Sequence, residues 1–525
     1  MQKPSSRTAF AVLNEITARD PSHDFLIDGV GRWSYASFTV EVNQCARALL
    51  ANGIVHGDRV GVLAGNRAEW LMVNFAAMSI GAITVGLNTW SSAKELSYQL
   101  HHAEVKFLFA EPQFRERDFV ALVSEARKLA NGLPHLEEII ALALADPDQW
   151  RRYGDFLDSG NAVGLDDLAV ARGKVVGDDI ACLLYTSGST ALPKGVPLLH
   201  RGLIENMWEI GERQHLVSDD RLWLAVSLFW SLACVNAVFA LFTHGGTIVL
   251  QHHFEAGEAL RLIEAARCTV FYGTPNMSLA IVEHPDYATA KLKTLRTGVT
   301  IGTAPQVRRI AEFGVSAICN VYGLTEAYGN STVTDAGLLL EQRLETVGQA
   351  LAGTEVRIMD PDTWVELPAG TQGEVALRGN LTPGYWNDPV RTAEAFNGDG
   401  WFRTGDLGVL DEAGYLYYRG RLKEMVKTGG INVAPAEVEE VLTTHPAIEL
   451  AFVTGIPDER LDEALAAVIV FKRDAYADEA ELKSHCRTVL ATYKTPRRFR
   501  FVDAEELPLT TTGKLQRNRL VELFS

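Results

Sequence analysis

Up to about Thr346 the chain alternates short runs rich in β-branched residues with longer amphipathic runs. The runs are residues 59–64 (strand), 68–80 (helix), 82–87 (strand), 96–101 (helix) and 106–110 (strand), with similar strands at 247–250 and 269–272. Strand–helix–strand alternation predicts parallel sheets with helices on both faces. The sequence therefore favours an α/β fold for most of the chain.

After Thr346 the pattern changes. Short strands between Gly and Pro turns, as in residues 353–363 and 373–379, predict an antiparallel β subdomain within a mixed-sheet domain. A compact α+β pattern follows, with helix 435–443, strand 450–454, strand 464–471 and helix 478–490. A chain of 525 residues usually forms more than one core. We therefore place a boundary at residues 421–424, between a large N-terminal domain (1–420) and a small C-terminal α+β domain (425–525).

Composition excludes several classes of protein. The formal net charge is −17 and the pI is about 5.3, so no general attraction to nucleic acid or anionic lipid is expected. The six cysteines form no Cys-x-x-Cys pair, which favours reduced thiols in a cytoplasmic protein. No secretory signal is visible at the N-terminus. Residues 70–90 and 222–242 are uncharged, but Gly, Asn and Ser interrupt both stretches, so we expect buried helix and strand there and no membrane span.

The sharpest chemical signal is the segment 184–195, Leu-Tyr-Thr-Ser-Gly-Ser-Thr-Ala-Leu-Pro-Lys-Gly. It follows a strand-like run, and a Ser/Thr/Gly loop lets backbone N–H groups and hydroxyls converge on phosphate oxygens. Gly188 permits a tight turn, and Lys194 adds a point charge. The segment is not a Walker A loop, because Pro193 stands where that pattern has Gly. Taken alone, it fits a surface turn equally well.

Five further motifs follow in order. They are Tyr-Gly-Leu-Thr-Glu (322–326), Trp-Phe-Arg-Thr-Gly-Asp (401–406), Gly-Arg-Leu-Lys-Glu (420–424), Lys-Thr-Gly-Gly-Ile-Asn-Val-Ala-Pro (427–435) and Pro-Leu-Thr-Thr-Thr-Gly-Lys (508–514). With the 184–195 segment they resemble the adenylate-forming superfamily, which includes AMP-forming acyl- and aryl-CoA synthetases, peptide-synthetase adenylation domains and beetle luciferases. The resemblance covers almost the whole chain. It implies a ligase that uses ATP, Mg²⁺ and coenzyme A to convert a carboxylic acid first to acyl-AMP and then to acyl-CoA.

The resemblance also implies which residues bind ATP. The phosphate loop would comprise Thr186, Ser187, Gly188, Ser189, Thr190 and Lys194, with Ala191 where the family usually has Gly. The adenine would stack on Tyr322 beside Gly323 and lie along Gly302, Ala304 and Pro305. Thr325 would contact the α-phosphate, and Glu326 would hold Mg²⁺, which prefers carboxylate and phosphate oxygens. Asp406 and Arg421 would bind the ribose hydroxyls.

Both half-reactions depend on the C-terminal domain in this family. Lys514 would bridge the carboxylate substrate and the α-phosphate, where a positioned cation offsets the charge of the pentacovalent transition state. The domain would then rotate about a hinge at Lys423. Lys427, Gly429 and Gly430 would next contact coenzyme A, since glycines let the thiol arm pass close to the backbone.

The acid is expected to be a hydrophobic monocarboxylic acid, bulky, alicyclic or aromatic. Its pocket would be lined by Trp230, Val235, Thr300 and Gly323, which are apolar or small. Trp230 stands where many relatives have His; it fits a pocket wall and an ordinary buried aromatic equally well. Two alternatives stay open: an acyl-AMP ligase that loads a carrier-protein thiol, and a nucleotide-binding relative without catalysis. A homodimer is expected only because it is the commonest oligomer.

Overall fold

The computed structural model describes residues 2–129, 132–142, 150–186, 193–287, 292–428, 431–458, 461–490, 492–509 and 515–524. The chain forms two compact units. The first comprises Met1–Glu355 and Arg378–Gly400, and the second comprises Val356–Leu377 and Trp401–Ser525. The predicted domains, 1–420 and 425–525, are defined by a rotation about a hinge at residues 421–424 between the two half-reactions. They stay predictions.

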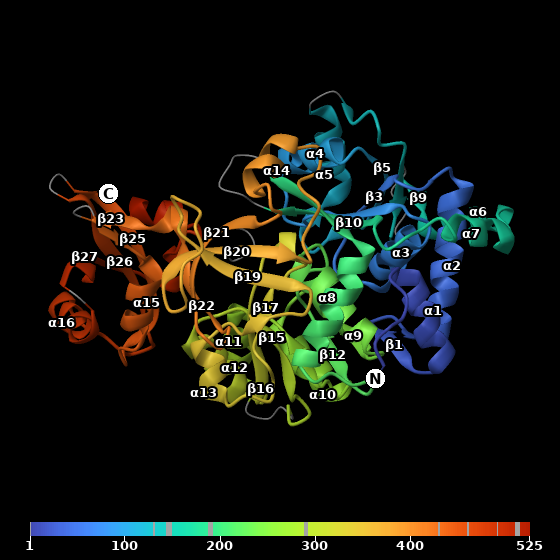
Figure 1. Ribbon diagram of the computed structural model, residues 1–525. Helices are drawn as coiled ribbons and strands as arrows, with labels where there is room; N and C mark the ends of the chain where they lie inside the picture. Colours follow the sequence, from blue (N-terminus) through green and yellow to red (C-terminus); the bar gives the residue numbers. More distant parts are fainter. Residues whose placement is uncertain are drawn as a thin grey trace. The chain divides into compact units, whose positions relative to one another are not determined.

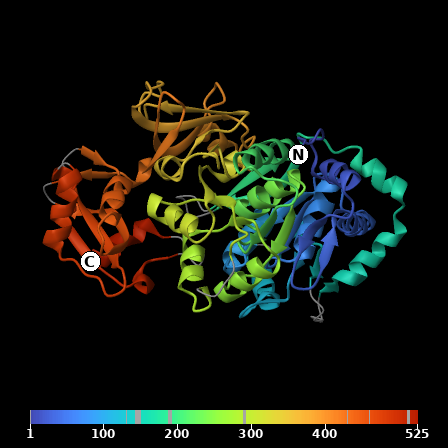
Figure 2. The same cartoon turned by 90° about the horizontal axis from the view of Figure 1, so that it is seen from below.

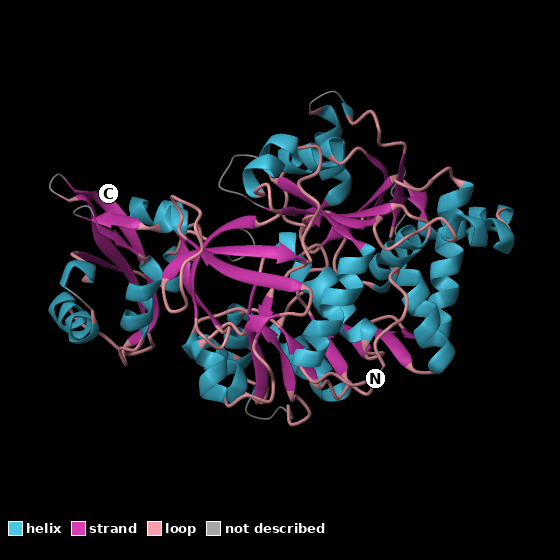
Figure 3. Cartoon of the chain, in the orientation of Figure 1, coloured by secondary structure: helices cyan, strands magenta, loops and turns pink. Residues whose placement is uncertain are grey.

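Two sheets with parallel central strands form the first unit (Figures 1 and 3). The nine-stranded sheet has the order β18 (Gln349–Ala350), β17 (Thr332–Val333), β16 (Ala317–Tyr322), β15 (Thr297–Thr300), β14 (Val270–Tyr272), β12 (Arg221–Leu224), β13 (Thr247–Leu250), β1 (Asp24–Ile27), β2 (Arg32–Ser34). The seven-stranded sheet has the order β11 (Lys194–Leu199), β10 (Ile180–Thr186), β4 (Ile83–Gly86), β3 (Arg59–Leu63), β5 (Val105–Ala110), β8 (Glu138–Ala141), β9 (Arg151–Arg152). Among these described strands, the antiparallel pairs lie toward the ends of the sheets: β1 with β2, β10 with β11, β16 with β17 and β17 with β18. This confirms the predicted parallel and mixed sheets.

Helices flank both sheets. They are α1 (Ala9–Arg19), α2 (Tyr35–Ala51), α3 (Ala68–Ser79), α4 (Ala93–His102), α5 (Phe119–Lys128), α6 (Tyr153–Ser159), α7 (Leu165–Arg172), α8 (His200–Arg213), α9 (Val238–Thr243), α10 (Ala256–Ala265), α11 (Pro275–Glu283), α12 (Ala304–Glu312), α13 (Leu340–Glu345) and α14 (Pro389–Ala395). A small hairpin, β6 (Gln113–Phe114) with β7 (Arg117–Asp118), precedes α5. In Figure 2 the teal helices α6 and α7 lie at the rim of the first unit.

The two uncharged stretches are buried secondary structure, as predicted. Residues 70–90 fall on α3 and β4, and residues 222–242 fall on β12, a π-helical turn (Ser231–Ala237) and α9. No helix in the described part of the chain is long and apolar enough to cross a membrane. The six cysteines are free and buried.

A cluster of buried phenylalanines joins the two sheets of the first unit. Phe75 on α3, which connects β3 to β4, packs 5.6 Å from Phe239 and 5.1 Å from Phe242 on α9. Phe25 on β1 lies 4.6 Å from Phe38 on α2, and its ring also meets Phe75 and Phe242. Stacked and edge-to-face aromatic pairs of this kind add to the energy of apolar burial. The helix between two strands of one sheet is thereby fixed against a strand and a helix of the other.

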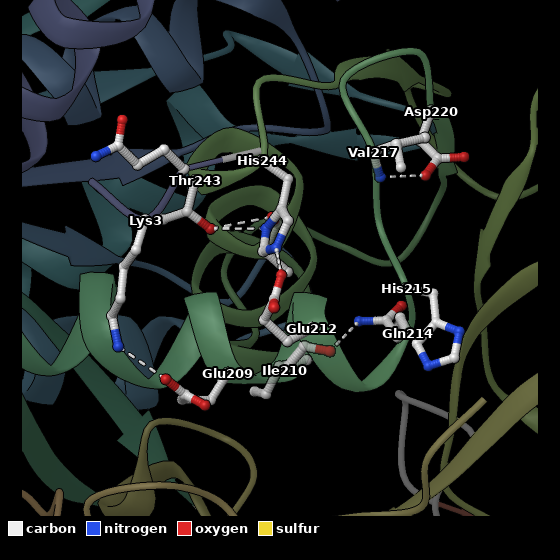
Figure 4. A network of polar contacts seen from close by, with 12 residues as sticks. Lys3, Glu209, Ile210, Glu212, Gln214, His215, Val217, Asp220, Thr243 and His244 are labelled. Atoms are coloured by element: carbon white, nitrogen blue, oxygen red, sulfur yellow. Dashed lines mark hydrogen bonds and ion pairs between the residues drawn. The ribbon is translucent and has the colours of Figure 1, made fainter. Parts of the chain in front are cut away.

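Polar contacts hold the C-terminal end of α8, which directly follows β11 (Figure 4). The buried His244 ring lies 3.2 Å from a Glu212 carboxylate oxygen and stacks on Trp208 at 4.3 Å. Beyond the helix, the Gln214 amide donates to the Ile210 carbonyl at 3.2 Å and to the Tyr272 hydroxyl at 2.8 Å. These bonds tie α8 to α9 and to the end of β14, so the strand–helix unit that starts at β11 is firmly placed.

The second unit contains an antiparallel sheet and a compact α+β module. The antiparallel sheet is β19 (Thr354–Met359), β20 (Gln372–Gly379), β21 (Phe402–Leu410) and β22 (Leu416–Arg421). The module comprises β23 (Val426–Thr428), β24 (Ile431–Val433), α15 (Pro435–Thr443), β25 (Ile448–Asp458), β26 (Asp462–Phe471), α16 (Glu479–Val489) and β27 (Arg498–Phe501). Val438, Leu442 and Leu482 of the two helices pack on Val453 and Ile469 of the strands. Both predicted patterns after Thr346 are confirmed.

Candidate functional site

The predicted site residues of the first unit follow the C-terminal ends of parallel strands. Thr186 ends β10, Tyr322 ends β16, and Thr300 ends β15. Trp230 comes in the segment after β12. Ligands of open α/β sheets bind beyond the carboxyl ends of the strands, so the topology supports a common binding region there.

A β-hairpin closes the predicted phosphate loop. Thr186 at the end of β10 and Lys194 at the start of β11 are partners across the antiparallel pair. Ser187, Gly188, Ser189 and Thr190 lie outside the described residues. The sequence suggests a loop through residue 195, but Lys194 begins a strand, because Val196 and Leu198 are buried in the core. The sheet therefore fixes the backbone of Lys194.

Lys194 and Glu326 meet the same tyrosine. The Lys194 ammonium donates to the Tyr385 hydroxyl at 3.4 Å and lies 4.4 Å from the centroid of its ring. The Tyr385 hydroxyl donates to Oε1 of Glu326 at 2.8 Å. Burial, reinforced by the Glu326 carboxylate, raises the pKa of Tyr385 above its usual range, so the phenol stays protonated and remains a donor. The predicted phosphate cation and the predicted metal ligand are thus brought together.

The Tyr-Gly-Leu-Thr-Glu motif makes a tight bend after β16. Tyr322 is buried at the strand end, and residues Thr325–Ala327 form a 3₁₀ turn. A Cβ on Gly323 would lie 2.3 Å from the Gly329 carbonyl oxygen, so the backbone passes where no side chain fits. The Thr325 hydroxyl donates to the Ser231 hydroxyl at 3.3 Å. The bend therefore places Thr325 and Glu326 beside the segment that follows β12.

The predicted adenine-face residues begin α12. The Thr303 backbone N–H donates to the Gln306 side chain at 2.9 Å, closing the first turn of the helix. Ala304 and Pro305 occupy that first turn, where Pro is tolerated because its missing N–H has no helical partner. Gly302 comes directly before it. Their contact with adenine stays a prediction.

Two of the predicted acyl-pocket residues lie at an aromatic cluster or beside it. The Trp230 ring lies 5.5 Å from Trp90 and 5.6 Å from Phe229, and Trp90 meets Phe229 at 5.1 Å. Val235 is buried in the π-helical turn that follows Trp230. Trp90 follows β4, so this cluster brings segments of the two sheets together.

The hydroxyl of Thr300, a further predicted pocket residue, is engaged in a hydrogen bond to the backbone. It is fully buried and donates to the Gly273 carbonyl at 3.1 Å. The hydroxyl therefore stabilises the backbone that directly follows β14.

In the second unit, the predicted ribose-binding pair is in direct contact. Asp406 on β21 and Arg421 on β22 are cross-strand partners, and Nε of Arg421 lies 3.0 Å from Oδ1 of the buried Asp406 carboxylate. Lys423 lies on a 3₁₀ turn (Leu422–Glu424) just after this pair. Lys427 lies on β23. Gly429, Gly430 and Lys514 fall outside the described residues.

The described residues offer hard oxygen donors for Mg²⁺ without a dedicated protein cage. No group of three or more His, Cys, Asp or Glu able to hold a metal occurs among them. The Glu326 carboxylate and the Thr325 hydroxyl are donors that suit Mg²⁺, which commonly binds through one or two carboxylates and substrate phosphates. The residues therefore fit a nucleotide-bound Mg²⁺.

Comparison with known proteins gives the family. The AMP-binding enzyme family matches residues 13–386, and the AMP-binding enzyme C-terminal domain matches residues 437–514. The acyl-CoA ligase sidI of Aspergillus fumigatus is 35% identical, covering 93% of this chain and 85% of that protein. A Mycobacterium tuberculosis ligase that joins CoA to a propanoyl group bearing a methyl-dioxo-octahydroindenyl substituent is 34% identical over 98% of this chain and 99% of that protein.

A solved structure of a CoA ligase supports the same family. The anthranilate CoA ligase AuaEII in complex with anthranoyl-AMP matches with a TM-score of 0.86 at 28% identity, covering 99% of this chain and 97% of that one. The chain therefore belongs to the AMP-binding enzyme family. This confirms the predicted superfamily, its fold and the predicted class, an AMP-forming acid–thiol ligase.

Three residues of this region escape prediction from sequence. Tyr385, Ser231 and Trp90 contact predicted site residues, but each belongs to a residue type that is usually structural. For Tyr385 a signal exists: it stands in Gly-Tyr-Trp-Asn-Asp-Pro (384–389), where Gly and Pro bracket an aromatic pair in a turn. Ser231 and Trp90 have no comparable signal.

Proposed function

We propose that the chain joins a bulky hydrophobic monocarboxylic acid, alicyclic or aromatic, to coenzyme A. The observation that supports the proposal is the contact of Tyr385 with both Lys194 and Glu326, which brings a cation and a carboxylate together at the end of the β10–β11 hairpin that leads into the proposed phosphate loop. The acid class is supported by the aromatic cluster at Trp230 and by the ring-bearing acyl groups of two relatives.

In the first half-reaction a carboxylate oxygen attacks the α-phosphorus of ATP. The α–β phosphoanhydride bond breaks, and pyrophosphate leaves. Lys194 and the loop through Thr190 would offset charge on the β- and γ-phosphates, and Thr325 would meet the α-phosphate. Glu326 would hold Mg²⁺, which would neutralise phosphate charge. Lys514 bridges the two reacting anions. Tyr322 stacks on adenine while Asp406 and Arg421 hold the ribose.

In the second half-reaction the coenzyme A sulfur attacks the acyl carbon. The bond to AMP breaks, AMP leaves, and the thiol proton is released. Turning about Lys423 would withdraw Lys514 and bring Lys427, Gly429 and Gly430 to the thiol arm. We also propose a cytoplasmic location, supported by six buried free thiols, and a homodimer on base rate alone, to be tested by sedimentation.

The test combines a panel of acids with two lysine variants. The protein is incubated with MgATP, coenzyme A and short, medium and long fatty acids, benzoates, cinnamates and polycyclic acids, and acyl-AMP and acyl-CoA are read by mass spectrometry. Lys514→Ala should lose acyl-AMP formation, whereas Lys128→Ala, on the exposed end of α5, should not.

Each outcome decides between functions. Acyl-CoA from a bulky hydrophobic acid supports the proposal, and a preference for an amino acid or a dicarboxylate contradicts it. Acyl-AMP without thioester indicates a carrier-protein thiol as acceptor. Absence of both products with every acid contradicts the reaction.

A further inference from the structure

Tyr385 is the described side chain that contacts two of the proposed phosphate-site groups at once. Its hydroxyl donates its one hydrogen bond to the Glu326 carboxylate at 2.8 Å, and the hydroxyl oxygen accepts a hydrogen bond from the Lys194 ammonium at 3.4 Å. The Lys194 ammonium also lies 4.4 Å from the ring centroid, within range of a cation–π interaction. The side chain is 8% exposed, so these contacts lie in a poorly hydrated environment where they are stronger than in water.

The backbone around Tyr385 is anchored to the same elements that carry its two partners. The Trp386 N–H donates to the Gly195 carbonyl at 2.9 Å, one residue from Lys194. The Thr382 N–H donates to the Glu326 carbonyl at 2.7 Å, and its hydroxyl donates to the Pro197 carbonyl at 2.7 Å. The segment 382–386 is thus hydrogen-bonded to β11 on one side and to the 3₁₀ turn on the other.

A third hydrogen bond anchors the backbone of Tyr385 itself. The Tyr385 N–H donates to the Thr392 hydroxyl at 2.9 Å, and Thr392 lies on α14. The segment that carries the phenol is therefore hydrogen-bonded to three elements, and the hydroxyl itself is held between Glu326 and Lys194. A hydroxyl held this way can orient a neighbouring carboxylate at no further entropic cost when the substrate arrives, as preorganised sites require.

We propose that Tyr385 is a positioning residue for the adenylation half-reaction, setting the Glu326 carboxylate through its hydroxyl and the Lys194 ammonium through its ring and oxygen before MgATP binds. The inference rests on the proposed roles of Lys194 and Glu326. Because those roles concern Mg²⁺ and the leaving pyrophosphate, Tyr385 should matter for the first half-reaction and not for the second.

The test separates the half-reactions in Tyr385→Phe, which keeps the ring and removes only the hydroxyl. Adenylation is followed as acid-dependent exchange of pyrophosphate into ATP at several Mg²⁺ concentrations. Losing one hydrogen bond to a charged group should lower the kcat/KM of the exchange reaction by roughly 10- to 100-fold. It should also raise the Mg²⁺ concentration needed for the half-maximal exchange rate. Conversion of supplied acyl-AMP to acyl-CoA should stay within about twofold of wild type, since pyrophosphate is absent from that step.

Two further variants separate positioning from stability. Tyr35→Phe removes another buried phenol of the same unit, which donates to the Gly246 carbonyl at 2.9 Å, and should lower stability without slowing either half-reaction selectively. Tyr385→His, whose ring can donate a hydrogen bond, should recover part of the lost exchange rate. If Tyr385→Phe does not fold, a folded Tyr385→His with selectively reduced exchange still supports the role.

Three results would overturn the inference. They are an exchange rate for Tyr385→Phe within about twofold of wild type, an equal fall in both half-reactions, or an unchanged Mg²⁺ dependence. If the wild-type protein makes acyl-AMP and Tyr385→Phe behaves like it, the role of Tyr385 is contradicted and the proposed function is not. If the wild-type protein makes no acyl-AMP, both the role of Tyr385 and the proposed function are contradicted.

Discussion

Replacing Gly323 by alanine tests whether the bend after β16 is built as tightly as the structure indicates. A Cβ there would lie 2.3 Å from the Gly329 carbonyl oxygen and 2.4 Å from Asn330 Cα, both of which are backbone atoms that cannot rotate away. Ordinary contact begins at 3.4 Å, so the facing backbone must move by about 1 Å. Overpacking of this kind costs about 1–3 kcal/mol of folding free energy.

The shift would also reach the proposed nucleotide site. The Ser331 N–H donates to the Tyr322 carbonyl at 2.9 Å, and the Asn330 carbonyl accepts from Asn206 at 2.8 Å. Moving residues 329–330 therefore strains the backbone of Tyr322, the proposed adenine platform. We expect Gly323→Ala to lower the free energy of unfolding by about 1–3 kcal/mol and to raise the KM for ATP more than the KM for the acid.

The matched control is Gly154→Ala. Gly154 lies in α6, and a Cβ added there would meet nothing within 4 Å. Removing a glycine at a compatible position should stabilise by about 0.4–1 kcal/mol with no change in kinetics. Urea unfolding and ATP-dependent kinetics measure both variants. Stability of Gly323→Ala within about 0.5 kcal/mol of wild type, together with an unchanged KM for ATP, would refute the packing argument.

Three further changes have expected outcomes. His200 is fully buried and accepts from the Ala9 N–H, and burial lowers its pKa to about 4. The unfolded chain therefore binds more protons than the folded chain between about pH 6.5 and 4. About 3 kcal/mol of the stability present above pH 6.5 should be lost across that window. Urea unfolding at several pH values should show that the free energy of unfolding falls less steeply with decreasing pH in His200→Gln. Trp230→Ala should lower kcat/KM for bulky aromatic acids by about tenfold relative to short fatty acids, since the half-buried indole would lose an aromatic contact of about 1 kcal/mol with a ring-bearing acid but little with a short chain; an acid panel measures the ratio, and a uniform loss would contradict a role in selectivity. Arg517→Met leaves the largely buried Glu439 carboxylate without its bidentate partner, at 2.6 and 2.8 Å, and should cost about 3 kcal/mol; thermal unfolding compared with Arg519→Met, whose Glu522 partner is exposed, isolates the effect.

Local signals explain which parts of the fold are predictable. Helix α15 has the predicted bounds because Pro435 sets the backbone of its first turn and an apolar stripe follows. Strand β13 also matches, because Thr247–Leu250 is a short, fully buried β-branched run. Strand β11 is missed, since a Lys-Gly-Val-Pro start carries turn residues and only pairing with β10 makes it a strand.

The same distinction divides the site residues. The proposed phosphate and ribose binding requires particular residue types at fixed spacing, so Lys194, Glu326 and Asp406 stand out in the sequence as members of motifs. Tyr385 contacts Lys194 and Glu326, and Ser231 contacts Thr325, through tertiary interactions that join positions far apart in the chain; a tyrosine or serine there has no chemical signature of its own. Supporting residues of this kind are fixed by the packing of the sheets and not by the chemistry of the ligand. Their substitution should therefore alter how well the motif residues are held while leaving every motif in the sequence intact, which is why the half-reaction kinetics of Tyr385→Phe carry information that the motifs cannot.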